Sequence, residues 1–426
     1  MKKTISIALA AAALTCGVAS GCNTKTPLDP QHGTADQSKL FGMCYLLEER
    51  SVESLNIEKE VELMKNMGVK TVRQWMHFTH FLKSPTETKQ DNQTTENMHK
   101  LLAECEKAGM VNIGMNHHNF DLNGVINSSA KPYSRDTNPD GNYVKWLDLY
   151  YQSWYTLVKE FPEVTYWEID NEPNNPDFMW DGQSHSAYSL KQMAAITADM
   201  FYYASRAIHD ANPNAITIMG GLTEPTGLGR GNTAKFLQTL YDDIKSGEFG
   251  YFYGKEDKAN ASKNPDDYFE IACWHPYMSE FNQKNFIEIN NEYYQIVLDN
   301  EGKHKKVFFT EIGWNDTNMG GEQNAISAMT QMYEAVKTMP YVETVNIFKL
   351  YDVGKKGNWD SYDEVRFGLI HDPNPSRVYY KLDIEKNSIN IAEDGRCIPG
   401  APKNKAYEYQ RLAGGSGSLE VLMSKG

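Results

Sequence analysis

The amino-acid sequence predicts an α/β fold, a (β/α)8 TIM barrel with long strand-to-helix loops. Between residues 39 and 385, short apolar or aromatic runs alternate with longer helical patterns about eight times, which is typical of a parallel sheet. Connections from helix to strand are short, whereas those from strand to helix are long, as in 119–140, 173–186 and 353–366. The functional loops of such barrels follow the carboxyl ends of the strands, so we expect the functional residues there.

Eight segments are predicted to be barrel strands, because each is a short run of β-branched, aromatic or other apolar residues. They are residues 40–46, 71–78, 111–117, 164–172, 215–222, 268–277, 307–314 and 342–351. The chain has 426 residues, of which 40% are hydrophobic and 23% charged, so it is long enough and apolar enough to bury the core of one barrel with insertions.

The first predicted helix shows the expected local signals most clearly. Ile57, Val61 and Met64 recur at i, i+4 and i+7, with Asn56 as the expected cap and Gly68 as the expected stop. This spacing places the three apolar side chains on one helical face, which can pack against the sheet.

The second predicted helix repeats this pattern, with Thr94 as its expected cap and Gly109 as its stop. Residues 246–266 depart from the alternation, because this long segment precedes a strand instead of following one. We interpret it as a structural insertion on the face opposite the functional loops.

The N-terminal residues form an export signal. Lys2 and Lys3 precede an apolar stretch over residues 5–14, and small residues then lead to Cys22. The run Ala-Ser-Gly-Cys that ends at Cys22 resembles a bacterial lipobox, in which the cysteine becomes the lipidated first residue of the mature protein. The resemblance implies a signal peptide over residues 1–21 and an exported lipoprotein that contacts the membrane through its lipid anchor only. Simple secretion is the alternative.

Three further segments complete the predicted organisation. Residues 22–38 are rich in Thr, Pro, Asp, Gln and Gly, as in a flexible tether. The catalytic barrel is expected over residues 39–390. Residues 391–426, which contain the Gly-Gly-Ser-Gly-Ser run at 414–418, are expected to form a C-terminal extension and tail outside the fold.

Composition excludes several partners. The chain has 56 acidic residues against 42 basic ones, and its net charge of −14 repels polyanions, so we expect no nucleic acid partner. The cysteines other than Cys22 that follow the signal are Cys44, Cys105, Cys273 and Cys397. They are too scattered for a disulfide framework or a zinc site, and no cofactor is expected.

Two glutamates stand at the ends of the fourth and seventh predicted strands. Glu172 belongs to the run Trp-Glu-Ile-Asp-Asn-Glu-Pro that begins at Trp167, and Glu311 to the run Thr-Glu-Ile-Gly-Trp that begins at Thr310. In a closed barrel both carboxylates converge above the axis at one mouth. Either run alone is equally typical of a turn with a solvated acid. The pairing of the two in barrel register points to hydrolysis of a glycosidic bond, which needs two carboxyl groups.

With these motifs the chain resembles the clan A glycoside hydrolases, which are retaining (β/α)8 enzymes, over residues 39–385. Within the clan it is most similar to family 39 and its bacterial relatives, through the WEIDNEPN and FFTEIGW runs and the segment Phe367–Ile370. The resemblance implies that Glu172 is the acid/base and Glu311 the nucleophile.

Three groups are expected around the nucleophile by the same resemblance, namely Arg73 on the second strand and His275 and Tyr277 on the sixth. A nucleophile must stay ionised, and a cation and a hydroxyl donor would keep it so. The resemblance also implies that Asn171 hydrogen-bonds the sugar 2-hydroxyl, an interaction that strengthens as the oxocarbenium ion develops. A turn residue is the alternative for Asn171, and a structural ring is the alternative for His275.

The adjacent pair His117 and His118 ends the third predicted strand. Successive strand residues point to opposite faces, so we expect one of them, His117, to line the mouth, unless the strand ends before both. No cluster of ligands with a recognisable spacing accompanies the pair, so no metal site is expected.

Glycan clefts need exposed aromatic platforms with polar groups around them. The candidates near strand ends are Trp75, Trp180, Trp274, Trp314 and Tyr351, of which Trp314 and Tyr351 are the expected sugar contacts. Core packing explains any one of these rings equally well. The eighth strand departs from the clan pattern, because it reads Ile-Phe-Lys-Leu-Tyr-Asp where many members place a tryptophan.

The sequence therefore predicts a lipid-anchored, retaining glycosidase that cleaves a β-linked oligo- or polysaccharide. The alternative from another class is a surface lipoprotein that binds glycans without turning them over. A metal-dependent barrel hydrolase is a third reading, for which no ligand set is visible. A separation of about 5 to 5.5 Å between the carboxyl groups indicates retention, and about 6.5 to 9.5 Å indicates inversion.

Overall fold

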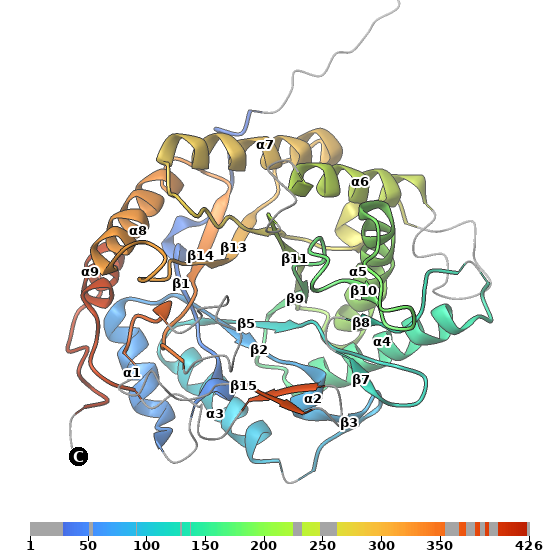
Figure 1. The fold of residues 1–426 in the computed structure, drawn as a ribbon, viewed down its shortest axis with the longest axis horizontal. Helices are drawn as coiled ribbons and strands as arrows, with labels where there is room; N and C mark the ends of the chain where they lie inside the picture. Colours follow the sequence, from blue (N-terminus) through green and yellow to red (C-terminus); the bar gives the residue numbers. More distant parts are fainter. Residues whose placement is uncertain are drawn as a thin grey trace, which may run out of the picture.

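The protein is a closed parallel barrel surrounded by helices, as seen in a computed structural model (Figure 1). The structure describes residues 29–50, 54–90, 92–127, 130–136, 138–224, 232–247, 262–353, 366–371, 380–383, 388–391 and 399–423. The predicted signal peptide, Cys22, Cys397 and residues 248–261 of the predicted insertion lie outside this part of the chain. The predicted fold class is confirmed.

The barrel has eight strands, and each lies within one residue of a predicted segment. They are β1 (Phe41–Cys44), β2 (Thr71–Trp75), β5 (Val111–Asn116), β9 (Tyr166–Asn171), β11 (Ile216–Thr223), β12 (Ala272–His275), β13 (Val307–Ile312) and β14 (Val342–Ile347). Each pairs in parallel with the next along the chain, and β14 pairs with β1 to close the ring. Consecutive order with right-handed crossovers is the expected topology of such a barrel.

Helices that follow the strands form the outer layer (Figure 1). They are α1 (Ile57–Met67), α3 (Gln93–Lys107), α4 (Asn142–Glu160), α5 (Leu190–Ala211), α6 (Asn232–Ser246), α7 (Gln283–Glu301), α8 (Glu322–Val336) and α9 (Asn404–Ala413). Shorter elements lie in the loops after the strands, among them α2 (Phe78–Phe81), β8 (Ala130–Lys131) and β10 (Trp180–Asp181).

The ends of α1 match the sequence, whereas the start of α3 does not. The side chain of Asn56 caps α1 by accepting from the Lys59 amide, and Gly68 ends the helix with a φ of 87°. That left-handed conformation favours glycine. The cap of α3 is Asn92, two residues before the expected Thr94. The Asn92 side chain accepts a hydrogen bond from the Thr94 amide, which makes Thr94 the second helical residue instead of the cap.

The helix that completes the outer ring, α9, comes from the segment that was expected to lie outside the barrel. It packs between α8 and α1 (Figure 1). Ala406 and Tyr409 are fully buried, and the Tyr409 hydroxyl donates to the Gly42 carbonyl of β1 at 3.0 Å. Beyond α9, Gly415 lies where a Cβ would stand 2.4 Å from the Asn66 carbonyl oxygen, so the glycine-rich run also packs on the fold. The barrel domain therefore extends past residue 390.

The described part of the predicted tether lies against the amino-terminal end of the barrel. The Gln37 amide nitrogen donates to the carbonyls of Val336 and Met339 at 3.2 and 3.0 Å, and the Ala35 amide donates to the Pro340 carbonyl at 3.1 Å. These carbonyls immediately precede β14, so residues 35–37 cover the base of the molecule. Among the described residues, no helix is both long and apolar enough to cross a bilayer.

Candidate active site

The carboxyl ends of the strands bring together five of the residues predicted to act on or around the reacting sugar carbon. Arg73 comes from β2, Asn171 and Glu172 from the end of β9, His275 from β12 and Glu311 from β13. All five side chains are largely buried. The barrel therefore gathers groups that lie as far as 238 residues apart in the chain.

Arg73 holds two of the carboxylates and the asparagine. Its Nη1 donates to Glu311 Oε1 at 2.5 Å, and its Nε donates to Glu168 Oε2 at 2.6 Å. Its Nη2 donates to Glu168 Oε1 and to Asn171 Oδ1, both at 3.0 Å. Such charge-assisted contacts are short and fix the geometry of their acceptors. Arg73 therefore fixes both Glu311 and Asn171 in place.

Glu311 receives a second donor, the Tyr277 hydroxyl, which lies 3.2 Å from Oε2. Burial raises the pKa of Tyr277 well above its usual value, and the Glu311 charge raises it further, so this phenol keeps its proton and acts as a donor. The two oxygens of Glu311 are thus each hydrogen-bonded, one to a guanidinium and one to a phenol. Both donors therefore fix the position of this carboxylate.

Glu172 lies next to this pair. One of its carboxylate oxygens, one of Glu311 and a ring nitrogen of His275 all lie within 4.8 Å of one another. Glu172 Oε1 is 3.0 Å from His275 Nδ1, and Oε2 accepts from the Asn175 side chain at 3.1 Å. The two strand-end glutamates therefore share one space above the barrel core.

His275 is the second cation of the site. Its burial favours the neutral ring, but the charge of Glu311 and contacts with Glu168 and Glu172 outweigh burial and raise its pKa to about 9. The same logic holds in reverse for Glu168, where burial is outweighed by Arg73 and His275 and the pKa falls to about 2. The site thus contains alternating charges, which compensate one another in a buried setting.

The turn that carries Glu172 is strained. Asp170 and Glu172 both have left-handed backbones, with φ of 72° and 48°. The Asp170 carboxylate accepts from the Asn171 amide at 2.9 Å and lies 3.3 Å from the ammonium of Lys131, which is itself fully buried. Residues in such conformations persist only where surrounding contacts hold them, and they are frequent at functional sites.

Two residues of the site were missed by sequence reasoning. A Cβ on Gly221 of β11 would stand 2.1 Å from His275 Nε2, so only glycine leaves room for that ring. The Gly221 amide also donates to Glu168 Oε1 at 3.2 Å, and its carbonyl accepts from the Glu172 amide at 3.1 Å. Thr310 donates to Glu168 Oε1 at 2.9 Å and lies 3.0 Å from His275 Nε2. The Gly-Gly pair at the end of the fifth strand was the available signal for Gly221.

His117 and His118 both follow β5, because the strand ends at Asn116. The alternation of faces within a strand therefore does not apply to them, and the contact of His117 with sugar stays a prediction. Both rings contact His77, which follows β2, with ring centroids 4.3 and 4.1 Å apart. Burial and neighbouring charges lower the pKa of His117 to about 3.

The aromatic candidates divide into buried and partly exposed rings. Tyr351 is 2% exposed and its hydroxyl donates to Glu60 at 3.0 Å, so the structure does not bring this ring to the site as a platform. Trp274 is also buried, and its Nε1 donates to Asn290 at 2.6 Å, on the side of β12 that faces α7. Trp314 packs edge-on against Phe281 with 6% of its surface exposed, and its contact with sugar stays a prediction. Trp75 and Trp180 are partly exposed.

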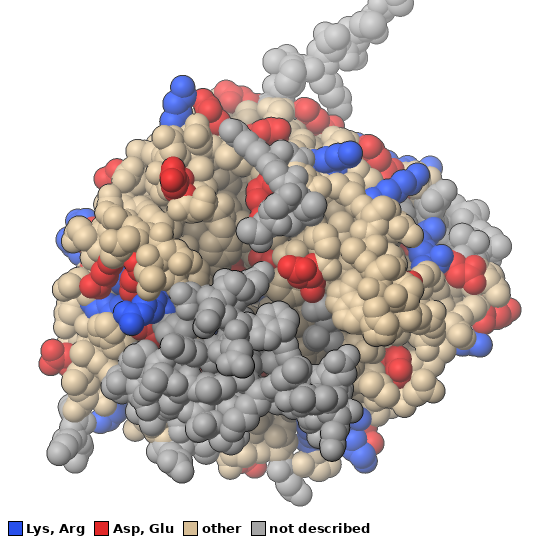
Figure 2. Space-filling model, in the orientation of Figure 1, with Lys and Arg blue, Asp and Glu red and all other residues tan. Residues whose placement is uncertain are grey.

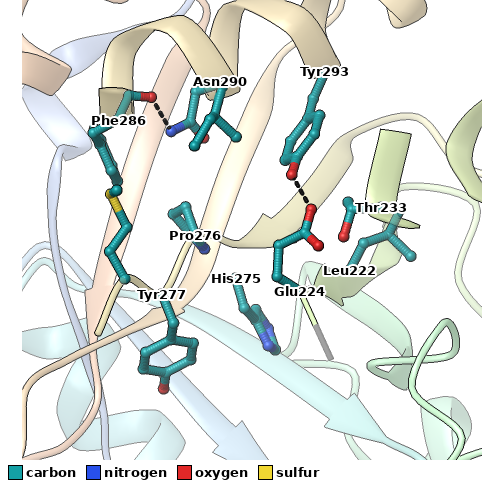
Figure 3. Close-up of a pocket in the computed structure, with 11 residues that line it drawn as sticks. Leu222, Glu224, Thr233, His275, Pro276, Tyr277, Phe286, Asn290 and Tyr293 are labelled. Atoms are coloured by element: carbon teal, nitrogen blue, oxygen red, sulfur yellow. Dashed lines mark hydrogen bonds between the residues drawn. The ribbon is translucent and has the colours of Figure 1, made fainter. Parts of the chain in front are cut away.

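A small cavity lies between the end of β12 and α7 (Figure 3). His275 and Tyr277 line it on one side, and Tyr293 of α7 donates to Glu224 on the other. His275 and Tyr277 therefore have this mostly apolar cavity behind them and the carboxylates in front of them.

Charge is distributed unevenly over the molecular face shown in Figure 2. Described acidic side chains lie near its centre, and basic side chains lie mostly toward its edge. Together with the net charge of −14, this arrangement favours neutral or cationic ligands over polyanions at this face.

Comparison with known proteins supports a carbohydrate-active barrel. The family model for cellulase (glycosyl hydrolase family 5) matches residues 32–347. No curated protein sequence matches the chain at a significant level.

Solved structures share the fold at low identity. One is a family 39 glycoside hydrolase from the gut symbiont Bacteroides cellulosilyticus WH2, with a TM-score of 0.55 and 15% identity over 89% of this chain; this chain spans only 64% of that one. Another is the β-glycosidase BGL167, with a TM-score of 0.56 and 12% identity over 89% of this chain and 96% of the other. A third is the family 1 β-glucosidase from Thermotoga maritima, with a TM-score of 0.52 and 12% identity over 91% and 99%.

The predicted clan is confirmed, while the family assignment changes. Family 39 appears only among structures of low identity, which share the fold, whereas the matching sequence model is that of family 5. That model covers well over half of the chain, from the segment before β1 to the end of β14. The chain therefore belongs to the cellulase family, glycosyl hydrolase family 5, within clan A of the glycoside hydrolases.

Proposed function

We propose that the protein is a retaining glycoside hydrolase that cleaves a β-linked oligo- or polysaccharide by double displacement, with Glu172 as acid/base and Glu311 as nucleophile. The observation that carries the proposal is the proximity of the two carboxylates. One oxygen of each and one ring nitrogen of His275 all lie within 4.8 Å of one another. This proximity supports the closer spacing of carboxyl groups, about 5 to 5.5 Å, that accompanies retention, over the about 6.5 to 9.5 Å of inversion.

In the first step Glu311 attacks the anomeric carbon while Glu172 gives its proton to the departing glycosidic oxygen. The C–O bond to the leaving sugar breaks as the ester bond to Glu311 forms, so the electron pair of the broken bond leaves with the aglycone and is protonated there. Arg73 and Tyr277 keep Glu311 ionised and aimed at the sugar. Asn171, held by Arg73, is placed to bond the sugar 2-hydroxyl.

The charge balance of the site supports Glu172 as the proton donor. With Glu168 and Glu311 ionised, the two cations Arg73 and His275 compensate them fully. Glu172, whose Oε1 lies 3.0 Å from His275 Nδ1, is the remaining carboxyl group of this cluster, and we assign it the role of proton donor.

In the second step the ester removes the charge of Glu311, and Glu172, now ionised, accepts a proton from water. The hydroxide equivalent attacks the same anomeric carbon, the ester bond breaks, and Glu311 leaves as a carboxylate. Two inversions at one carbon give net retention, and each group returns to its starting protonation state.

Kinetics of two variants test these roles. Glu311→Ala should lower kcat by at least about 10⁴-fold on aryl β-glycosides, because covalent catalysis is lost. Glu172→Gln should lower it by about 10² to 10⁴-fold, and less for substrates whose leaving group needs no proton. Glu96→Gln, on the exposed face of α3, is the matched control and should keep wild-type turnover.

Product stereochemistry completes the test. NMR of the first-formed anomer should show retention, and sodium azide should rescue Glu311→Ala with a product of opposite configuration. An inverted product from the wild type would remove the nucleophile role of Glu311. A glycan that binds but is never cleaved, across a panel of plant and microbial polysaccharides, would favour the binding lipoprotein instead.

We also propose that the chain is exported and anchored through a lipid on Cys22. The lipobox-like run that ends at this cysteine supports the proposal. In cells grown with a labelled fatty acid, the expressed protein should carry the label and be recovered in the membrane fraction. Cys22→Ala should abolish both. Cys16→Ala, inside the predicted signal peptide, should leave both unchanged.

A further inference from the structure

Three histidines from two loops meet beside the catalytic groups. His77 follows β2, and His117 and His118 follow β5, the neighbouring strand of the barrel. One ring nitrogen from each can be chosen so that all three lie within 4.8 Å of one another. Forty residues of sequence separate His77 from the pair, so the spacing in the chain does not reveal the group.

The nitrogens of this group are short of partners. Nδ1 of His77 and Nδ1 of His117 are shielded from solvent and have no hydrogen-bond partner within the described residues. His77 as a whole is only 3% exposed. A buried polar atom without a partner costs free energy, which a ligand can recover. Three rings whose nitrogens come this close, two of them with an unpartnered Nδ1, therefore point to a ligand that accepts nitrogen lone pairs.

The third ring is oriented by a neighbour. His118 Nδ1 lies 2.8 Å from the Thr79 hydroxyl, which leaves Nε2 of that ring for another contact. Metal-bound imidazoles commonly use their second nitrogen in this way, since the outer contact fixes the ring. His80, whose ring lies 5.4 Å from His77, instead pairs with Glu48 at 2.8 Å and is outside the group.

The nearby cations are already compensated. Lys131 lies beside these rings but 3.3 Å from the Asp170 carboxylate, and Arg73 is paired with Glu168 and Glu311. The other two groups of potential ligands in the described residues contain Glu168, Glu172, Glu311 and His275, whose atoms are engaged in the catalytic network. Of these three groups in the described residues, the histidine group is the one whose members make no ion pair with the catalytic carboxylates.

We propose that His77, His117 and His118 bind one divalent transition-metal ion of the zinc class through a ring nitrogen each. Imidazole is a preferred ligand of Zn²⁺, Ni²⁺ and Cu²⁺, and three protein ligands leave a fourth position for water. With Zn–N bonds of about 2.0 to 2.1 Å, the nitrogens of a tetrahedral site lie about 3.3 Å apart. The stacked rings of His77 and His118, tilted by 23°, must therefore rotate about their Cβ–Cγ bonds to converge on the ion.

Direct binding of metal to the full chain, expressed without a polyhistidine tag, tests the site. Calorimetry with Zn²⁺ should give one equivalent per chain, and Co²⁺ should give visible absorption bands of a four-coordinate site. His77→Gln should weaken Zn²⁺ binding at least about 100-fold, since loss of a ligand exceeds the 10 to 100-fold effect of losing an outer contact. Thr79→Val should weaken it about 10-fold.

Controls separate this site from other effects. His99→Gln, on α3 with its ring paired to Glu163, should bind Zn²⁺ as the wild type does. Glu172→Gln should also bind normally, so a failure here is distinct from a failure of the proposed catalysis. Absence of stoichiometric Zn²⁺ binding by the wild type, or unchanged affinity in both His77→Gln and Thr79→Val, would overturn the proposal. Circular dichroism checks that each variant is folded. Should His77→Gln not fold, the Zn²⁺ affinity of Thr79→Val tests the proposal.

Discussion

At the residue scale, one hydroxyl group makes a direct hydrogen bond to the candidate nucleophile. The Tyr277 phenol donates to Glu311 Oε2, and hydrogen bonds to charged groups contribute about 1.5 to 3 kcal/mol. Tyr277→Phe should therefore lower kcat by about 10 to 150-fold with little change in the unfolding midpoint. Steady-state kinetics and thermal melts check both results. Tyr293→Phe, at the far side of the cavity in Figure 3, is the control whose turnover should stay near wild type.

The protonation of His275 makes stability depend on pH. Because its pKa rises from an unfolded value of 6.5 to about 9 in the fold, its contribution is fully present below about pH 6.5 and is lost as pH rises through about 9. The unfolding midpoint of the wild type should therefore fall between pH 7 and pH 10. In His275→Gln the fall should be smaller, because the titrating group is gone. Equal slopes in the two proteins would contradict a charged His275.

Glycine at position 221 is required by the ring opposite it. In Gly221→Ala the added Cβ would meet His275 Nε2 at 2.1 Å, so the ring must move away from Glu172. We expect kcat/KM to fall at least about 10-fold and stability to fall by about 1 to 3 kcal/mol, the usual cost of overpacking. Gly182→Ala, where the nearest atom lies at 3.3 Å, should leave both nearly unchanged in the same assays.

At the scale of elements, the turn after β9 depends on a buried ion pair with β8. Lys131→Met would leave the Asp170 carboxylate buried without its cation, which typically costs about 3 to 5 kcal/mol. Denaturant unfolding should show this loss. The double variant Lys131→Met with Asp170→Asn should recover part of it, because no unpaired charge then remains. A single variant as stable as wild type would show that the pair does not hold the turn.

The elements show how far the sequence predicts this protein. Strand positions follow from apolar runs, and Glu172 and Glu311 follow from the strand ends, because both depend on local pattern and barrel register. The cap of α3 was misplaced, since Asn92 and Thr94 both suit a cap and only the backbone decides between them. His77 was missed, because the predicted strand 71–78 included it, whereas β2 ends at Trp75 and leaves His77 in the loop beyond. Tyr351 is buried against α1, which local sequence does not reveal, and its contact with sugar stays a prediction.

For the whole molecule, the C-terminal segment is a structural part of the barrel. Lys403, at the start of α9, is buried between Asp316 and Asp352 at 2.9 and 2.7 Å, which join the loops after β13 and β14 to the helix. Lys403→Met should lower stability by about 3 to 5 kcal/mol in denaturant unfolding, because it leaves the largely buried Asp352 carboxylate without its lysine, whereas Asp316 keeps Lys405 at 2.6 Å. Arg411→Ala, on the exposed face of the same helix, should leave the midpoint unchanged.

The segment that covers the base of the barrel determines which end of an anchored protein would face the membrane. Residues 35–37 are fixed beneath β14, at the end opposite Glu172 and Glu311. Six residues lie between Cys22 and Asp29, so the seven Cα–Cα steps from one to the other span at most about 25 Å. A lipid on Cys22 would hold the barrel upright close to the bilayer with its opening directed outward, so long, insoluble chains could approach without passing between enzyme and envelope.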